Sequence, residues 1–379
     1  MKKIYDCCIV GTSPIALLMA FKFLKDKKKI VIIEKKTDYG GAWSNETADH
    51  LCANKVETTC HLIEHFTGVY EKISKLSGIQ FTRCNPQPVK LINNKMYPYF
   101  SPSHILMELL IIIAKILIFP FFRLYKVASP MKIKRGQNLN FVTLLKRFMF
   151  LITYKIPSIF TYNGIMEPSI GFSKFVDQMV NDLKGLGVIF IHDCFMDVYQ
   201  STSTEPLVIR LSRGNLKSRK IYLSESVDIC KESTFAKTLK TNLSIKKTPY
   251  WHILIEVFGC TLDSIPSYIH FPEDKFFHRL SIDKVFINQN DKFFLLLQLR
   301  VNPNDLNQKF IIEHVRKILL MFVSKVDSDD ICIRKTFEDF FYASAKDAYL
   351  TGSKITEQIC VIPSIGDLAR NVATNPLFK

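Results

Sequence analysis

The chain lacks the usual features of a secreted or a metal-binding protein. Its ten cysteines are scattered and include no CxxC pair, the spacing common in zinc and redox motifs. Cys7 and Cys8 lie in a predicted buried strand, where a free cysteine behaves as a small hydrophobic residue. The apolar run at the N-terminus is too short for a signal peptide. We therefore expect reduced thiols, no bound metal and a cytoplasmic location.

Acidic residues are few relative to basic ones: 35 Asp and Glu stand against 51 Lys and Arg, and the formal net charge is +16. Such an excess attracts phosphate ligands, nucleic acid or acidic lipid, although an ordinary lysine-rich solvated surface has the same composition. The apolar content of 47%, with 12% aromatic residues, excludes an intrinsically disordered protein. A chain of 379 residues can bury a large core and is long enough for two domains.

A strand, a tight turn, a helix and a second strand are predicted at the start of the chain. The apolar run 4–10 stops at Gly11, and a helical pattern of apolar residues follows through Leu24. A second apolar run, 30–33, ends on Glu34. This order is typical of the opening unit of a parallel sheet that binds a dinucleotide.

The turn has the pattern G-x-S-x-x-A, with Gly11, Ser13 and Ala16 where dinucleotide-binding turns have small residues. Gly11 allows the chain to turn sharply, and Ala16 allows the helix to pack closely on the sheet. Ser13 has a Cβ where a pyrophosphate comes closest to the backbone, while the amides of the helix N-terminus still favour an anion. Glu34 is placed to accept hydrogen bonds from an adenosine ribose, and an acid there disfavours a 2′-phosphate.

The residues after Glu34 extend this pattern, because an acid, several polar residues and a Gly-Gly doublet follow in order. This stretch, together with Pro14 in the phosphate loop, resembles the N-terminal region of many FAD-binding oxidoreductases. The resemblance implies that the doublet brings the backbone close to the dinucleotide. An ordinary β-α-β unit with a Gly-Gly turn is the alternative. The resemblance adds the following residues to the predicted cofactor site: Lys35, Gly40, Gly41, Ala42 and Trp43.

Two later segments are similar to further landmarks of the amine-oxidase-like flavoproteins. In residues 164–198 a Pro/Gly turn introduces a helix that closes on a glycine, and the resemblance places Val198 next to the adenine. In residues 359–372 an apolar strand leads to Gly366 and Asp367 at a helix start, where the acid of this family approaches the ribityl chain. An N-cap aspartate is the alternative role for Asp367.

Taken together, the three landmarks resemble the superfamily of amine oxidases, protoporphyrinogen oxidase, phytoene desaturases and UDP-galactopyranose mutase. The resemblance implies an α/β fold with a Rossmann-like FAD-binding domain built from discontinuous segments, an inserted helical region and an antiparallel-sheet substrate domain. The expected boundaries are 1–95, 161–205 and 331–379 for the FAD-binding segments, 96–160 for the insertion and 206–330 for the substrate domain.

The inserted region contains a strongly apolar stretch from His104 to Tyr125, followed by a second apolar helix with a basic rim. It is almost long enough to span a bilayer, but Glu108 and Lys115 lie inside it and Pro120 interrupts it. Three interpretations stay open: a buried helix of the insertion, a pair of helices inserted into a membrane surface, and a spanning helix. The second predicts peripheral membrane association.

Candidate catalytic residues are few. His61 and His65 frame an H-x-x-E-H pattern that inverted zincin proteases use on a helix, but no diagnostic third ligand follows, and a structural histidine is the simpler interpretation. In similar flavoproteins a histidine near this point lines the flavin, which makes His61 a candidate. Short strands between 205 and 300 predict a sheet that forms a substrate wall. Arg279 on that wall is the candidate for binding an anionic substrate group, and a surface arginine is the alternative.

The function that the resemblance implies is that of an FAD-dependent oxidoreductase, amine-oxidase-like or desaturase-like. Such an enzyme transfers a hydride from a small-molecule substrate, here anionic or lipid-linked, to the flavin, and the protein supplies position and electrostatics. No nucleic-acid partner is expected. A redox-neutral mutase similar to UDP-galactopyranose mutase is one alternative. A binding protein of the Rab GDP-dissociation-inhibitor type, which resembles this fold and works without flavin, is the other. Ser13 favours that last class, and Glu34 disfavours it.

Overall fold

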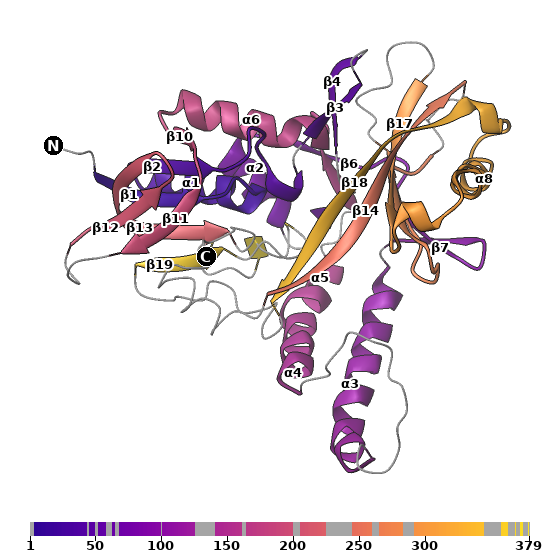
Figure 1. The fold of residues 1–379 in the computed structure, drawn as a ribbon. Helices are drawn as coiled ribbons and strands as arrows, with labels where there is room; N and C mark the ends of the chain where they lie inside the picture. Colours follow the sequence, from indigo (N-terminus) through magenta and orange to yellow (C-terminus); the bar gives the residue numbers. More distant parts are fainter. Residues whose placement is uncertain are drawn as a thin grey trace.

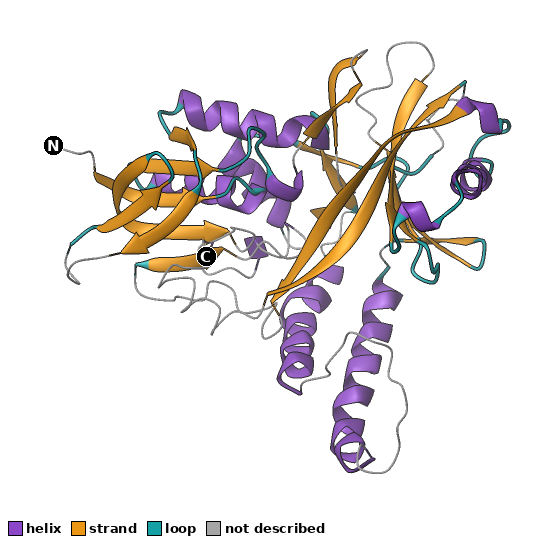
Figure 2. Cartoon of the chain, viewed as in Figure 1, coloured by secondary structure: helices purple, strands orange, loops and turns teal. Residues whose placement is uncertain are grey.

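The computed structural model describes two large β-sheets, each with helices packed on one face, and two small ones (Figures 1 and 2). The first sheet lies toward the N-terminus, and the second is separated from it along the long axis of the molecule. The described residues are 4–43, 45–49, 52–57, 63–64, 68–99, 101–125, 141–160, 164–199, 205–224, 245–259, 265–282, 292–344, 358–362, 368, 372–373 and 378.

The first sheet has the strand order β10-β2-β1-β13-β12-β11, with β19 also paired to β13. Strands β10, β2, β1, β13 and β19 run parallel, and β11 and β12 continue the sheet as an antiparallel meander. The strands therefore come from three separated parts of the chain. Their bounds are Ile4–Val10 (β1), Ile30–Glu34 (β2), Ile189–His192 (β10), Phe195–Tyr199 (β11), Leu207–Leu211 (β12), Gly214–Ser224 (β13) and Ile359–Ile362 (β19).

Helices α1 (Pro14–Lys25), α2 (Val69–Ser77) and α6 (Phe172–Gly185) cover one face of this sheet (Figure 1). The side chains of β1 alternate: Cys7 and Ile9 pack against the helices, and Cys8 and Val10 pack with apolar residues of β11 and β12 on the other face. Because both faces are covered, β1 and β2 are apolar almost throughout. Burial raises the pKa of the Cys7 thiol to about 11, as expected for an unreactive core cysteine.

The second sheet has the order β18-β14-β17-β16-β15-β7-β8. Its strands are Val89–Ile92 (β7), Lys95–Pro98 (β8), Ile245–Phe258 (β14), Tyr268–His270 (β15), Phe277–Ile282 (β16), Lys292–Leu299 (β17) and Ile331–Ser344 (β18). Alternate residues such as Ile253, Leu297 and Leu280 form a core with the buried side of α8 (Gln308–Leu319). This sheet lies between α8 and the first sheet (Figure 1). Its other face therefore turns toward the first sheet.

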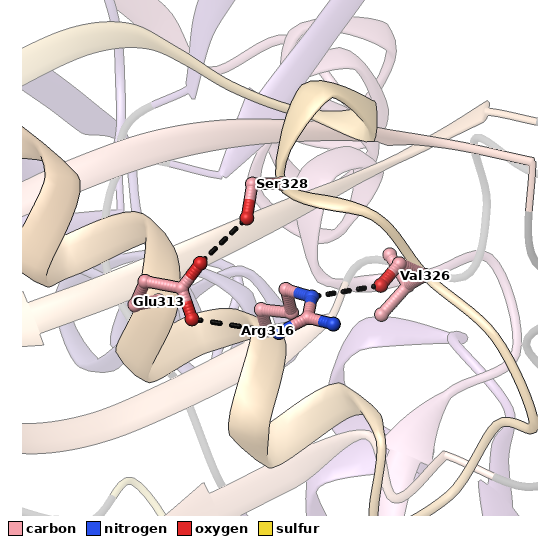
Figure 3. A network of polar contacts seen from close by, with 4 residues as sticks. All are labelled: Glu313, Arg316, Val326 and Ser328. Atoms are coloured by element: carbon pink, nitrogen blue, oxygen red, sulfur yellow. Dashed lines mark hydrogen bonds and ion pairs between the residues drawn. The ribbon is translucent and has the colours of Figure 1, made fainter.

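A polar network fixes the end of α8 to the segment that leads into β18 (Figure 3). Glu313 accepts a 2.6 Å hydrogen bond from the Ser328 hydroxyl and pairs with Arg316 at 3.5 Å. Arg316 in turn donates to the Val326 carbonyl at 3.0 Å. The Ser328 hydrogen bond, aided by the Arg316 charge, lowers the pKa of Glu313 below its usual range.

Two small sheets lie near the junction of the two large ones. One pairs β3 (Asn45–Asp49) with β4 (Cys52–Glu57), and the other has the order β5-β9-β6 (Ile63–Glu64, Ile165–Pro168 and Phe81–Arg83). Glu64 of the H-x-x-E-H pattern is thus in a strand, which is not the helix that the zincin pattern requires. His61 and His65 lie outside the described residues.

The inserted region forms helices α3 (Pro102–Tyr125) and α4 (Phe141–Phe150), followed by a π-helical turn, η2 (Leu151–Lys155), and α5 (Ile156–Ile159). Together α3, α4 and η2 form a helical pair, the hairpin, which projects away from both large sheets (Figure 2). Within the described part of the chain, no helix is long and apolar enough to cross a membrane.

The sheet pairing differs from the sequence-based assignment at three places. Strands β12 and β13 were assigned to the substrate sheet, but Ile221 to Leu223 form an apolar run that pairs in parallel with β1. Strand β18 was assigned to the FAD-binding segment 331–379, but it pairs with β14 from Ile245 to Val257. Strands β7 and β8 also join the second sheet instead of the first. Local alternation does not specify the partner of a strand, and this explains all three differences.

Candidate functional site

The predicted phosphate turn lies where β1 ends and α1 begins. Gly11 adopts a φ of 97°, a conformation that favours glycine, and its N–H donates to the Ile33 carbonyl at 2.8 Å. Ser13 is the N-cap of α1, and Pro14 is its first helical residue. No acid lies in the first turn of α1. The partial positive charge of this helix end is therefore directed at the carboxyl edge of the parallel strands, without an acidic side chain of its own to offset it.

Thr12 connects three parts of the predicted site. Its hydroxyl donates to the Glu34 carboxylate at 2.6 Å and accepts from the Gly40 N–H at 2.8 Å. The second oxygen of Glu34 accepts from the Lys36 N–H at 3.0 Å. The turn, the acid at the end of β2 and the Gly-Gly doublet are thus held together by side-chain hydrogen bonds. Glu34 is largely buried, so these bonds also compensate the desolvation of its charge.

Two buried hydroxyls at this edge have no hydrogen-bond partner within the described residues: Ser13 Oγ and Ser224 Oγ. Ser13 occupies the N-cap position, yet its hydroxyl makes no capping bond. Ser224 ends β13 one residue after Leu223, which pairs with Val10, so it lies beside Gly11 in the register. Buried polar atoms are almost always paired. Two unpaired hydroxyls beside a glycine turn and a helix N-terminus are what an absent phosphate group would satisfy, so these residues fit a dinucleotide.

The other predicted cofactor residues lie in varied surroundings. Ala16 of α1 is fully buried, as expected for close packing of the helix on the sheet. Gly40 has a φ of 106° and Gly41 a φ of 62°, and the 3-10 turn η1 (Gly41–Trp43), which contains Ala42, follows directly. The Trp43 ring packs at 5.8 Å from the Phe172 ring of α6, in the core that α1 shares.

Lys35 is exposed, and Val198 packs in the core on the meander side of the first sheet. Tyr39, between Lys35 and the doublet, bonds through its hydroxyl to Nε2 of His192 at 2.7 Å, and thereby ties this loop to β10. His61, Gly366 and Asp367 lie outside the described residues.

A second group of polar residues crosses the second sheet in register. His252, Gln298, Arg279, His270 and Lys90 are direct partners across β14, β17, β16, β15 and β7. We call these five residues the polar row. Their neighbours in sequence pack under α8, so the row lies on the opposite face, the one that turns toward the first sheet.

The polar row is held by hydrogen bonds around Gln298. Its amide oxygen accepts from Arg279 Nε and lies 2.7 Å from His278 Nδ1, and its amide nitrogen lies 2.9 Å from Nε2 of His252. Arg279 also donates to the Tyr268 hydroxyl at 3.2 Å. If the Gln298 nitrogen donates, as this network requires, His252 carries its proton on Nδ1. That atom is buried and has no partner among the described residues.

The histidines of this face are held neutral. Burial first, and then the positive charge of Arg279, lowers the pKa of His252 to about 3 and that of His278 to about 3. Burial and the charges of Arg279 and Lys90 lower the pKa of His270 to about 4. At neutral pH the face therefore presents the fixed cations of Arg279 and Lys90 among uncharged imidazoles, which suits an anionic group.

The structure thus combines a largely parallel sheet with a glycine turn at its edge and a second, mostly antiparallel sheet, an arrangement similar to that of α/β proteins that bind dinucleotides. A scan against protein-family models found no match, and a search of curated proteins found none either. Solved structures with similar folds are known, and three of them illustrate their range.

The chain is similar to putrescine oxidase bound to putrescine, with 10% sequence identity over 98% of this chain and 97% of that chain and a TM-score of 0.57. It is similar to the Rab GDI of Plasmodium falciparum, with 12% identity over 100% and 98% of the two chains and a TM-score of 0.56. It is also similar to reduced UDP-galactopyranose mutase, with 13% identity over 89% and 83% and a TM-score of 0.51. These comparisons confirm the resemblance inferred from the sequence at the level of the fold.

Sequence reasoning missed several residues of this site. Thr12 occupies a variable position of the motif, and its place next to Ser13 was the one signal that could have indicated its role. Ser224 lies at the end of a strand whose partner was wrongly assigned. The polar row had a weak signal, because His252 and Gln298 each interrupt a run of apolar residues. Such residues are rarely buried without a reason.

Proposed function

We propose that this protein is an FAD-dependent oxidoreductase. The observation that carries the proposal is the pair of unpartnered buried hydroxyls, Ser13 and Ser224, at the edge where Gly11 and the N-terminus of α1 meet. The hydrogen bonds of Thr12 to Glu34 and Gly40 support it, because they preorganise the three parts of the turn before any ligand binds. The similarity to putrescine oxidase supports the same class.

In this proposal the chain's own residues bind and position the two reactants. Ser13, Ser224 and the first amides of α1 would hold the pyrophosphate, and Glu34 would accept from the ribose. Bound FAD would supply a flavin that accepts a hydride from the substrate. The protein would orient both partners and exclude water, and it needs no nucleophile for this reaction.

We further propose that the substrate carries an anionic group that binds at the polar row. Arg279 presents a guanidinium there, and Lys90 adds a second positive charge on the same face. The neutral His252 has a buried Nδ1 with no partner in the described part of the chain, so it can donate to a substrate oxygen. A guanidinium binds carboxylate and phosphate groups well because its charge strengthens each hydrogen bond that it donates.

A binding protein without flavin is the second candidate. The carboxylate oxygens of Glu34 already accept bonds from Thr12 and Lys36, and this arrangement stabilises the loop without a ribose. The full-length similarity to Rab GDI agrees with this alternative. A mutase has no comparable observation of its own in this chain.

The Ser13→Ala variant separates the two candidates. Without FAD, the variant should be as stable as the wild type or more stable, because it removes an unsatisfied buried hydroxyl. With FAD, it should bind about ten- to a hundredfold more weakly, since a hydrogen bond to a charged phosphate contributes about 1.5–3 kcal/mol. Both quantities are measured by thermal unfolding and by flavin fluorescence titration. Equal FAD affinity of variant and wild type, or no FAD binding by either, would reject the oxidoreductase proposal.

A pair of glycine variants tests whether the effect on FAD binding is specific to the turn. Gly11→Ala forces a residue with a Cβ into a φ of 97°, so it should also weaken FAD binding by about tenfold or more. Gly185→Ala is its matched control, because a Cβ at Gly185 would meet nothing within 4 Å. Gly185→Ala should therefore bind FAD as the wild type does.

A further inference from the structure

Among its described side chains, the hairpin buries a narrow apolar seam between its helices. Ile105 and Ile112 of α3 and Leu151 of η2 are buried in it, and Leu109 and Phe148 pack against them. These residues already give the pair a small core of its own. The side chains on the remaining faces of the helices are thus not needed to hold the hairpin together.

Many of the side chains exposed on those remaining faces are nevertheless apolar. A helix that faces water normally carries polar side chains on its outer side, and large exposed apolar patches mark interaction sites. We call the following residues the hairpin surface, all of them 40–66% exposed: Leu106, Met107, Leu110, Ile111 and Leu117 on α3, Leu145 and Met149 on α4, and Ile152 on η2.

The charges of this part of the chain are almost all positive. Glu108 is partly exposed and pairs at 3.3 Å with Lys155, which is buried, so the charges of this acid and this base offset each other within the hairpin. Lys115 is exposed on α3. From residue 109 to residue 166 the sequence has no acid and nine basic residues, which is more than half of the net charge of +16: Lys115, Arg123, Lys126, Lys132, Lys134, Arg135, Lys146, Arg147 and Lys155.

We infer that the hairpin surface docks on an anionic lipid bilayer. The exposed leucine, isoleucine and methionine side chains match the acyl chains below the headgroups, and the basic residues match the negative charge of the headgroups. Long side chains such as Lys115 can place their methylene groups among lipids and keep the ammonium group at the headgroup level. The ion pair of Glu108 with Lys155 reduces the repulsion between this acid and the headgroups. A lipid-linked substrate would then be close to the protein, but the docking itself does not depend on the bound cofactor.

The test is vesicle flotation of the full chain, with vesicles of phosphatidylcholine alone and with phosphatidylserine added. The wild type should float with the anionic vesicles, and raising the salt concentration should reduce the bound fraction. A Leu110→Glu, Leu117→Glu double variant should have a partition coefficient onto the vesicles that is lower by about tenfold or more, because it places two charges among the lipids. The matched control is a Leu186→Glu, Leu320→Glu variant, which changes two exposed leucines outside the hairpin and should float as the wild type does.

Each outcome bears on the inference. If the wild type fails to float with anionic vesicles, or if the double variant floats as well as the wild type, lipid docking at this surface is wrong. If the wild type instead forms a dimer that the double variant dissociates, the occupant is a second copy of the chain and the inference is also wrong. Circular dichroism checks the fold of the double variant, and the milder Leu110→Ser, Leu117→Ser variant replaces it if it unfolds.

Discussion

Acidification from pH 7 to pH 5 should destabilise the fold through the buried histidines, and His252 gives the sharpest test. Its pKa is about 3 in the folded protein, because of burial and then the charge of Arg279, against roughly 6.5 in the unfolded chain. Between these values the unfolded chain takes up a proton and the native protein does not. His252 therefore has no such effect on stability above about pH 6.5, and the free energy of unfolding falls as the pH drops below that value.

The magnitude follows from the difference in proton uptake. A pH of 5 lies about 1.5 units below the pKa of the imidazole in the unfolded chain, and each unit corresponds to about 1.36 kcal/mol. The free energy of unfolding should therefore fall by about 2 kcal/mol because of this one residue. Urea unfolding of the wild type and of His252→Gln, each at pH 7 and pH 5, measures it. The variant should lose about 2 kcal/mol less than the wild type between the two pH values, whatever its stability at pH 7.

Leu254→Ala supplies the matched control. Leu254 is buried in the same strand, and its truncation should cost about 2–5 kcal/mol without removing a titrating group. This variant should keep the full pH dependence of the wild type. If His252→Gln loses as much stability on acidification as the wild type does, the buried neutral histidine is not the cause and the reasoning fails.

Three further substitutions test other contacts by urea unfolding at pH 7. Thr12→Val removes the hydroxyl that links the turn to the Gly-Gly loop and should cost about 1–3 kcal/mol; an unchanged midpoint would count against the link. Arg334→Met removes a cation that bonds to the buried carboxylate of Glu256 and should cost about 3–5 kcal/mol, whereas a loss below about 1 kcal/mol would mean the pair is effectively solvated. Phe277→Ala truncates a fully buried ring and should cost about 3–5 kcal/mol, and a smaller loss would show that the core under α8 collapses around the gap.

The first half of the candidate site was predictable because its signals are local. The sequence of strand, glycine turn, helix and acid lies within about one β-α-β unit, and the register of β1 with β2 follows from it. Gly11, Ser13 and Glu34 are brought together as that order predicts. The bonds of Thr12 were not predictable, since the side chain at a variable motif position is not specified by the motif.

The polar row, the second half of the candidate site, depends on pairing between strands that are distant in the sequence. Lys90 and His270 are partners in adjacent strands although 180 residues separate them. The local sequence around either residue does not predict this pairing. A one-residue shift in register would turn His252 and Gln298 into the core under α8. For the same reason the alternation in β13 predicted a strand correctly and its sheet incorrectly.

The hairpin was predictable in part. Its helices were predictable from their apolar content, but the sequence left open whether that content is buried. The structure shows one apolar seam and an apolar outer surface on the same helix, as Ile112 and Leu117 illustrate. A helix with apolar residues on most of its circumference carries little periodic signal that would separate a buried face from an exposed one.

The most direct test of the central proposal is a structure determined after adding FAD to the purified protein. We expect one FAD whose pyrophosphate lies within hydrogen-bond distance of Ser13 Oγ and at the N-terminus of α1, with its ribose at Glu34. A structure with FAD absent at saturating concentration, or with FAD bound away from the Gly11 turn, would contradict it.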